Sequence, residues 1–156
     1  MNALLFYLFL ALFISFICSL VEAILLSIPQ SYLMSLESEN SWSKSFLSLK
    51  NNIDKPLAAI LTLNTVAHTI GAAGVGAQVT NIYGDEFLGI ASAILTVLIL
   101  FFSEIIPKTI GANYWKGLSK FTFYILKAML FITYPVVIIS IKITKLFAKD
   151  KQNKVT

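Results

Sequence analysis

Two long apolar runs limit what this chain can fold into. They cover Ala3–Ile28 and Phe87–Phe102, and the second can be extended to about Ile106. A helix of about 20 mostly apolar residues crosses a bilayer core, and runs without strict alternation favour helices over a barrel. Of the 156 residues, 57% are hydrophobic and 13% are charged, which is more apolar surface than a small soluble core can bury. We therefore predict an all-α integral membrane protein.

Two further apolar runs determine how many helices cross. Pro56–Val79 is more polar but carries no formal charge, whereas Phe121–Ile141 is interrupted by Lys127 and Pro135. The first run of the chain could also be a secretory signal peptide. It lacks a basic leading region, is too long for the apolar part of a signal and contains Glu22, so we interpret it as a spanning helix.

The lysines predict the topology. All 12 basic residues are lysines that lie from Lys44 onward, and cytoplasmic loops are enriched in positive charge. Three crossings with the N-terminus outside keep every lysine in the cytoplasm. A fourth crossing would place the five lysines of the tail outside, although the length of the last apolar run would also permit an ordinary fourth helix.

We therefore predict three spanning helices per subunit, at about 3–28, 56–79 and 86–107, within a membrane domain that covers residues 1–150. A pair of amphipathic cytoplasmic helices is expected at about 30–50, with a turn near residues 39–41. Helices lying in the membrane interface are expected at about 116–148, broken at Pro135, with Lys127, Lys142 and Lys145 reaching for headgroups. Residues 151–156 would form a basic cytoplasmic tail of this multi-pass plasma or inner membrane protein.

The chain lacks the residues that several functional classes require. The single cysteine, Cys18, excludes a disulfide or a cysteine metal cluster within one chain. The sequence contains no HExxH motif and no phosphate-binding glycine loop after a strand. We expect neither an enzyme nor a nucleotide site, and the placement of the lysines indicates topology, not nucleic-acid binding.

Ionisable residues inside spanning helices are costly and are therefore functional candidates. Glu104 is the sharpest, because Pro107 removes a backbone donor and frees carbonyl oxygens near this carboxylate. A carboxylate with unpaired carbonyls suits a hard cation. Alternatively, Glu104 could simply pair with Lys108 one turn later, and Glu22 could pair with a neighbouring helix.

The second span adds polar and small residues on one face. Asn64 and His68 are four residues apart, while Gly71 and Gly74 permit close helix approach. Asn64 could instead be a hydrogen-bonding contact between helices, His68 a packing residue, and the glycines packing positions. Other polar residues that could hold a metal or line a cavity are Glu22, Thr65 and Ser103.

The segments EAILLS, LNTVAHTIGAAGVGA and SEIIPKTIGA occur in this order along the chain. In these three motifs the chain resembles the transmembrane domain of the CNNM and CorC/CorB magnesium transporters, from roughly Ala3 to Lys149. The resemblance implies a homodimer in the bilayer, with three spans, a cytoplasmic helix pair and a juxtamembrane helical belt in each subunit. It also implies Mg²⁺ transport, coupled to Na⁺ in the export direction.

The metal ligands that the resemblance implies are Ser27, Asn64 and Glu104, with Pro107 marking a helix distortion. His68 stands where many members carry a second asparagine, so metal preference or pH response could differ. The chain ends at Thr156 without the CBS module that usually follows in this family, so we expect a minimal member or a fragment. The competing hypotheses are a membrane-embedded metal sensor or scaffold, and an anchor that dimerises through its glycine-rich second helix.

Overall fold

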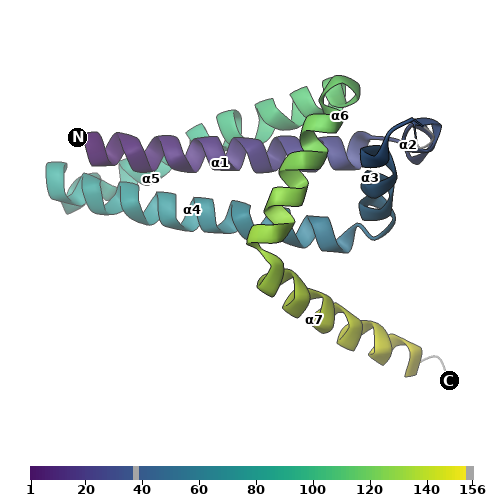
Figure 1. Ribbon diagram of the computed structural model, residues 1–156. Coiled ribbons are helices and arrows are strands. Elements are labelled where there is room, and N and C mark those ends of the chain that lie inside the picture. Colours follow the sequence, from purple (N-terminus) through teal and green to yellow (C-terminus); the bar gives the residue numbers. More distant parts are fainter. Residues whose placement is uncertain (37–38, 154–156) are drawn as a thin grey trace.

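The computed structural model describes residues 1–36 and 39–153, with side chains described through residue 148 (Figure 1). The described residues form helices and short turns, without a strand. Three helical segments are long and apolar enough to cross a membrane: Asn2–Ser27, Asp54–Tyr83 and Asp85–Ile132. The all-helical class and the three candidate spans are therefore confirmed. The third segment continues well past residue 107, where the sequence predicted that the span ends.

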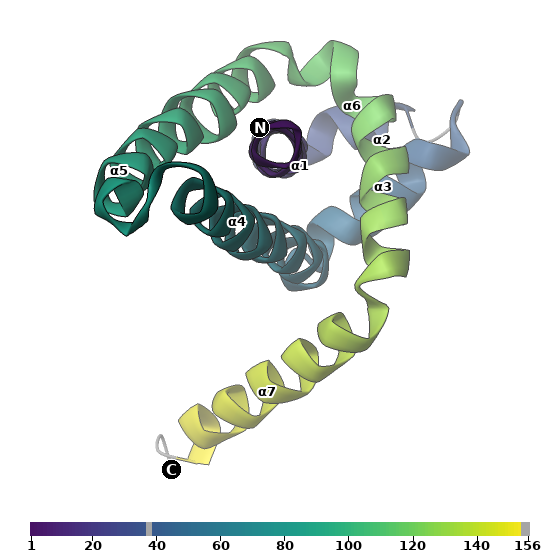
Figure 2. The same cartoon turned by 90° about the vertical axis from the view of Figure 1, so that its left-hand side faces the viewer.

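Helix α1 (Asn2–Ser27) lies between α4 (Asp54–Tyr83) and the third helical segment, as Figure 2 shows in a view along α1. A β-carbon added at Gly71 would overlap Ala11, and one added at Gly74 would overlap the ring of Tyr7. Glycine therefore brings α4 close to α1 of the same chain. The anchor hypothesis assigned this glycine-rich helix to contacts between chains, but here Gly71 and Gly74 pack within one chain.

The third helical segment contains two irregularities. After a 3₁₀ turn (Asp85–Phe87), helix α5 (Leu88–Leu98) leads into a π-helix (Ile99–Ile105) and then into α6 (Ile106–Ile132). Pro107 lies in the first turn of α6 and has no N–H for the carbonyl four residues earlier, so regular α-helical bonding is lost there. A second distortion is a kink at Tyr114, whose φ of −116° and ψ of 19° are not helical.

Two short helices, α2 (Gln30–Leu36) and α3 (Ser41–Asn51), connect α1 to α4. Pro29 separates α1 from α2, and Ile28 before it has the extended backbone that a following proline favours. The sequence predicted a cytoplasmic pair of helices at about 30–50, and α2 and α3 lie at these positions. A turn was expected near residues 39–41. The structure has a turn at Glu39, and α3 begins at Ser41, whereas residues 37 and 38 lie outside the described residues.

After Tyr114, the rest of α6 runs across α1 and α4, and α7 (Tyr134–Asn153) continues away from the bundle (Figures 1 and 2). The break between these helices falls at Thr133, two residues before the predicted position, and Pro135 lies in the first turn of α7. Proline fits a first helical turn because its missing N–H has no intrahelical partner there. The backbone of the predicted tail is described only to residue 153.

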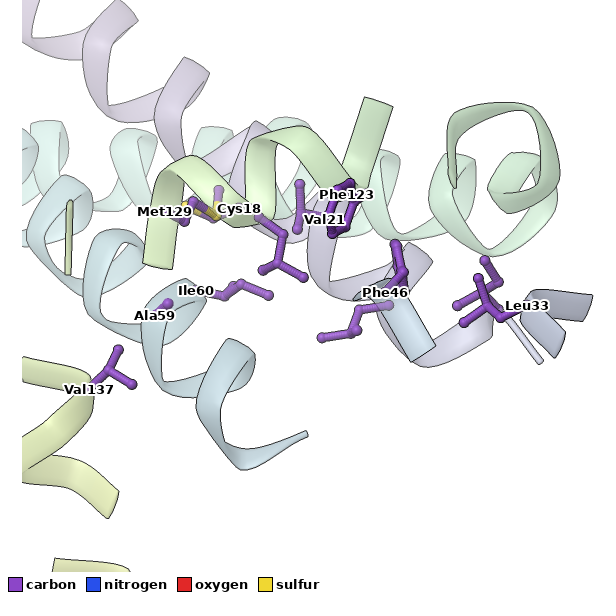
Figure 3. Packing of buried hydrophobic residues seen from close by; sticks show 12 residues of the cluster. Cys18, Val21, Leu33, Phe46, Ala59, Ile60, Phe123, Met129 and Val137 are labelled. Carbon is purple, nitrogen blue, oxygen red and sulfur yellow. The ribbon is translucent and has the colours of Figure 1, made fainter. Parts of the chain in front are cut away.

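The main hydrophobic core lies at the α2–α3 end of the bundle, where these crossing helices meet (Figure 3). Phe46 of α3 and Leu126 of α6 are fully buried there. Four other helices also contribute, through residues that include Cys18, Val21, Leu33, Ile60 and Val137. This core holds the end of α1 that carries Glu22.

Candidate cation site

Polar side chains from α1 and α4 face each other in a regular register. Ser15 and His68 lie within hydrogen-bonding distance, with 2.6 Å between Oγ and Nε2. Because the two helices run in opposite directions, the next turn places Ser19 in register with Asn64. The Ser19 hydroxyl and the Asn64 side-chain oxygen are buried and lack a hydrogen-bond partner among the described residues. An unpartnered buried oxygen is costly and therefore points to something that it could bind.

Glu22 adds a carboxylate to this row. It lines a cavity of about 190 Å³ together with Asn64, and the other walls are the apolar side chains of Leu57, Ile60 and Leu61. One amide and one carboxylate thus face a small space between α1 and α4. Oxygen ligands of this kind suit hard cations such as Mg²⁺.

Glu104 reaches the same region from the π-helix. The Lys108 ammonium lies 3.1 Å from a Glu104 oxygen and 3.7 Å from a Glu22 oxygen. Lys108 therefore joins the carboxylate of α1 to that of the third helical segment. The close approach of the helices at Gly111 makes this possible, because a β-carbon there would lie 2.7 Å from that of Ala23 and 3.0 Å from the Leu20 carbonyl oxygen.

The structure contains both the ion pairs that were expected as alternatives to a metal site and a pair of carboxylates that could hold a cation. Glu104 pairs with Lys108, and Glu22 pairs with a neighbouring helix, as the structural alternatives for both residues stated. The same pairs bring two carboxylates together, which the separate positions in the sequence did not indicate. Among the described residues, no group of three or more histidine, cysteine, aspartate and glutamate side chains is placed to hold a metal. A site here would therefore depend on these two carboxylates with neutral oxygens.

The remaining predicted residues lie in different surroundings. Thr65 is exposed on α4, whereas Ser103 is buried and donates to the Leu12 carbonyl oxygen at 3.0 Å. Ser27 is half-buried at the end of α1 and is not among the residues that line the cavity of Glu22 and Asn64. Glu104 does not line this cavity either, but Lys108 joins it to Glu22. Glu22 is thus linked to both Asn64 and Glu104, whereas Ser27 lies further along α1.

Lys50 holds the end of α1 next to Ser27. Pro29 cannot donate to the Leu25 carbonyl oxygen, and the Lys50 ammonium donates to it instead at 2.9 Å, with a second contact of 3.5 Å to the Leu26 carbonyl oxygen. Burial of this ammonium lowers the pKa of Lys50 below its ordinary value. This lysine connects α3 to the helix that carries Glu22.

Sequence reasoning did not select Ser19 or Lys108 as site residues. Ser19 could have been found from its spacing, because Ser15, Ser19 and Glu22 follow one another at helical intervals that place them on one face. Lys108 was considered only as a partner of Glu104. Its contact with Glu22 depends on how α6 packs on α1, which no local pattern reveals.

The fold and the site together define a helical membrane protein with an oxygen-rich polar region between its spanning helices. Residues 6–156 match the family model described as the cyclin M transmembrane N-terminal domain, and the chain belongs to this CNNM family. The family is linked to Mg²⁺ transport and is not a known catalytic family.

Curated relatives support this family membership. The chain is 32% identical over 145 residues to a UPF0053 protein of Synechocystis, covering 92% of this chain and 42% of the relative. It is 34% identical to a UPF0053 protein of Haemophilus influenzae, over 81% of this chain and 32% of that protein. The UPF0053 inner membrane protein YfjD of Escherichia coli is 26% identical, over 70% of this chain and 26% of its own length. The chain thus spans less than half the length of these relatives.

Proposed function

We propose that this chain is the membrane domain of a transporter that carries Mg²⁺, with Na⁺ coupling and in the export direction. The main support is that Glu22 shares a cavity with the unpartnered side-chain oxygen of Asn64 and that Lys108 joins Glu22 to a second carboxylate, Glu104. Mg²⁺ prefers oxygen ligands and usually keeps several of its waters. Two carboxylates with neutral oxygens would bind it reversibly, as a transporter requires.

The proposal also includes a third ligand, an oligomeric state and an orientation in the membrane. Ser27 stays in the proposed ligand set because of the family resemblance, although it lies apart from the cavity. We further propose a homodimer in the inner membrane with its N-terminus outside and its C-terminus in the cytoplasm. The lysine distribution supports this orientation, and the relative named as an inner membrane protein supports the location.

Mg²⁺ binding to the purified protein tests the proposal. Calorimetry in detergent would compare the wild type with Glu104→Gln, Asn64→Ala and the control Thr65→Ala, in Na⁺ and in choline buffers. We expect Glu104→Gln and Asn64→Ala to weaken binding by at least about tenfold, because each removes an oxygen ligand or its charge. Thr65→Ala should bind like the wild type, because Thr65 is exposed.

Transport itself requires a flux measurement in proteoliposomes. Mg²⁺ movement that depends on a Na⁺ gradient and is lost in Glu104→Gln would support the proposal. Folded protein that binds Mg²⁺ without moving it would favour the metal sensor or scaffold. The Lys108 ion pairs favour one further candidate, a structural anchor, and this candidate predicts that Glu104→Gln leaves Mg²⁺ binding unchanged.

A further inference from the structure

The ammonium of Lys108 lies where two carboxylates from different helices meet. Its nitrogen is 3.1 Å from a Glu104 oxygen and 3.7 Å from a Glu22 oxygen. We infer that Lys108 is a tethered cation that competes with the transported ion for these two carboxylates and thereby sets the affinity of the site. This inference rests on the proposed function, because it assigns a regulator to the same site.

Competition follows from charge and distance. A magnesium ion bound directly by a carboxylate sits about 2.0–2.1 Å from its oxygen. The ammonium already lies within 4 Å of both carboxylates. An ion bound to the same carboxylates would be close to the ammonium, and the two positive charges would repel each other strongly. Two carboxylates and one ammonium give the empty site a net charge of −1, whereas the two carboxylates without the ammonium would carry −2. The arriving ion must therefore displace Lys108 to gain the full attraction.

The geometry also lets Lys108 leave. Its side chain is 46% exposed, compared with 32% for Glu22 and 26% for Glu104. A lysine has a flexible four-carbon stem, so its ammonium can turn away from the carboxylates when another cation takes its place.

A second, independent feature points to a ligand at this position. The Asn64 side-chain oxygen is buried without a hydrogen-bond partner among the described residues, and it shares a cavity with Glu22. Lys108 is not among the residues that line this cavity. The ammonium therefore balances the carboxylates while the neutral ligand remains open for an incoming ion.

Chemical labelling of the wild-type protein tests displacement directly. Lysines would be acetylated with an amine-reactive reagent in choline buffer, with and without saturating Mg²⁺, and quantified by mass spectrometry. We expect Mg²⁺ to raise the labelling of Lys108 severalfold, because the ammonium is released from its carboxylates. Lys120, an exposed lysine on the same helix, serves as the internal control and should not change. Equal labelling of Lys108 in both conditions would overturn the inference.

Substitution provides the second test. Lys108→Met keeps most of the side-chain length and removes the charge, and it should tighten Mg²⁺ binding about fivefold to tenfold, an estimate for a partly exposed charge. Lys108→Arg should stay within about twofold of the wild type, because it keeps the charge that competes. Lys120→Met controls for the general effect of removing one positive charge from the protein. Melting curves verify folding, and Lys108→Gln replaces Lys108→Met if the latter does not fold.

The outcomes separate this inference from the proposed function. Unchanged or weaker Mg²⁺ binding in folded Lys108→Met, together with loss of binding in Glu104→Gln, would refute the tethered cation but leave the site in place. Binding that Glu104→Gln does not affect would refute the proposed site itself. Tighter binding in Lys108→Met with loss in Glu104→Gln would support both.

Discussion

The two ends of α1 are packed in different ways. At the α2–α3 end, residues such as Cys18, Val21 and Leu25 are fully buried in a core to which α3, α4, α6 and α7 contribute. Toward the N-terminus, α1 contributes only partly buried side chains to a small cluster whose buried members are Val75, Val79 and Leu95. The extensive core lies at the end that carries Glu22. The end of α1 that carries the polar site is thus held by extensive packing, while the N-terminal end of α1 is held by fewer contacts.

The largest effect should come from a cavity in the extensive core. Leu126→Ala removes a fully buried side chain and should lower the free energy of unfolding by about 3–4 kcal/mol. The matched substitution Leu95→Ala, in the small cluster, should cost at least about 1 kcal/mol less, because its surroundings can collapse or be refilled by lipid more easily. Denaturant unfolding in detergent would measure both. Equal losses would show that the two ends are packed equally well.

The glycine contacts provide the next comparison. Gly111→Ala places a β-carbon against Ala23 and the Leu20 carbonyl oxygen, so α6 must move away from α1. We expect the free energy of unfolding to fall by about 1–3 kcal/mol, and Mg²⁺ binding to weaken because this contact lets Glu104 approach Glu22. Gly89→Ala is the control, since nothing lies within 4 Å of its added β-carbon. It should be neutral or stabilising by up to about 1 kcal/mol.

The spans and single polar residues could be predicted from the sequence, whereas features that depend on helix packing could not. The three spans follow from apolar runs, because a bilayer demands them whatever the packing. The kink at Tyr114 was not predicted, since no proline or glycine stands at that position. Asn64 and Glu104 could be selected one at a time as polar groups in apolar surroundings. The meeting of Glu22 with Lys108 could not, because it depends on helix packing between distant segments.

Lys50 tests the link between the core and the site. Lys50→Met removes the donor to the Leu25 carbonyl oxygen that Pro29 leaves open, and it should lower the free energy of unfolding by about 1–2 kcal/mol. Lys44→Met, at an exposed position on the same helix, should have no measurable effect. Thermal melting of the three proteins at neutral pH would compare them. A loss of equal size in both variants would remove the special role of Lys50.

The pH dependence of stability gives an independent check on Lys50. Its folded-state pKa is lowered by burial, so on raising the pH the folded protein releases this proton before the unfolded chain does. In the window between the lowered pKa and the ordinary lysine value, the unfolded state binds more protons, and the free energy of unfolding should rise with pH. Subtracting the profile of Lys50→Met isolates this term from those of the other lysines. A difference profile that is flat or falls with pH would contradict the burial of the ammonium.

The smallest effect should come from the hydrogen bond between Ser15 and His68, where the row of polar residues begins. Ser15→Ala should cost about 0.6 kcal/mol, since hydrogen bonds between membrane helices contribute little on average. Ser19→Ala, one turn closer to Glu22, removes a hydroxyl that has no partner among the described residues and should cost less or even stabilise. If instead Ser19→Ala weakens Mg²⁺ binding in calorimetry while Ser15→Ala does not, the ion site extends along α1 from Glu22 to Ser19. Such a result would place the boundary between structural and ion-binding residues at the turn between Ser15 and Ser19.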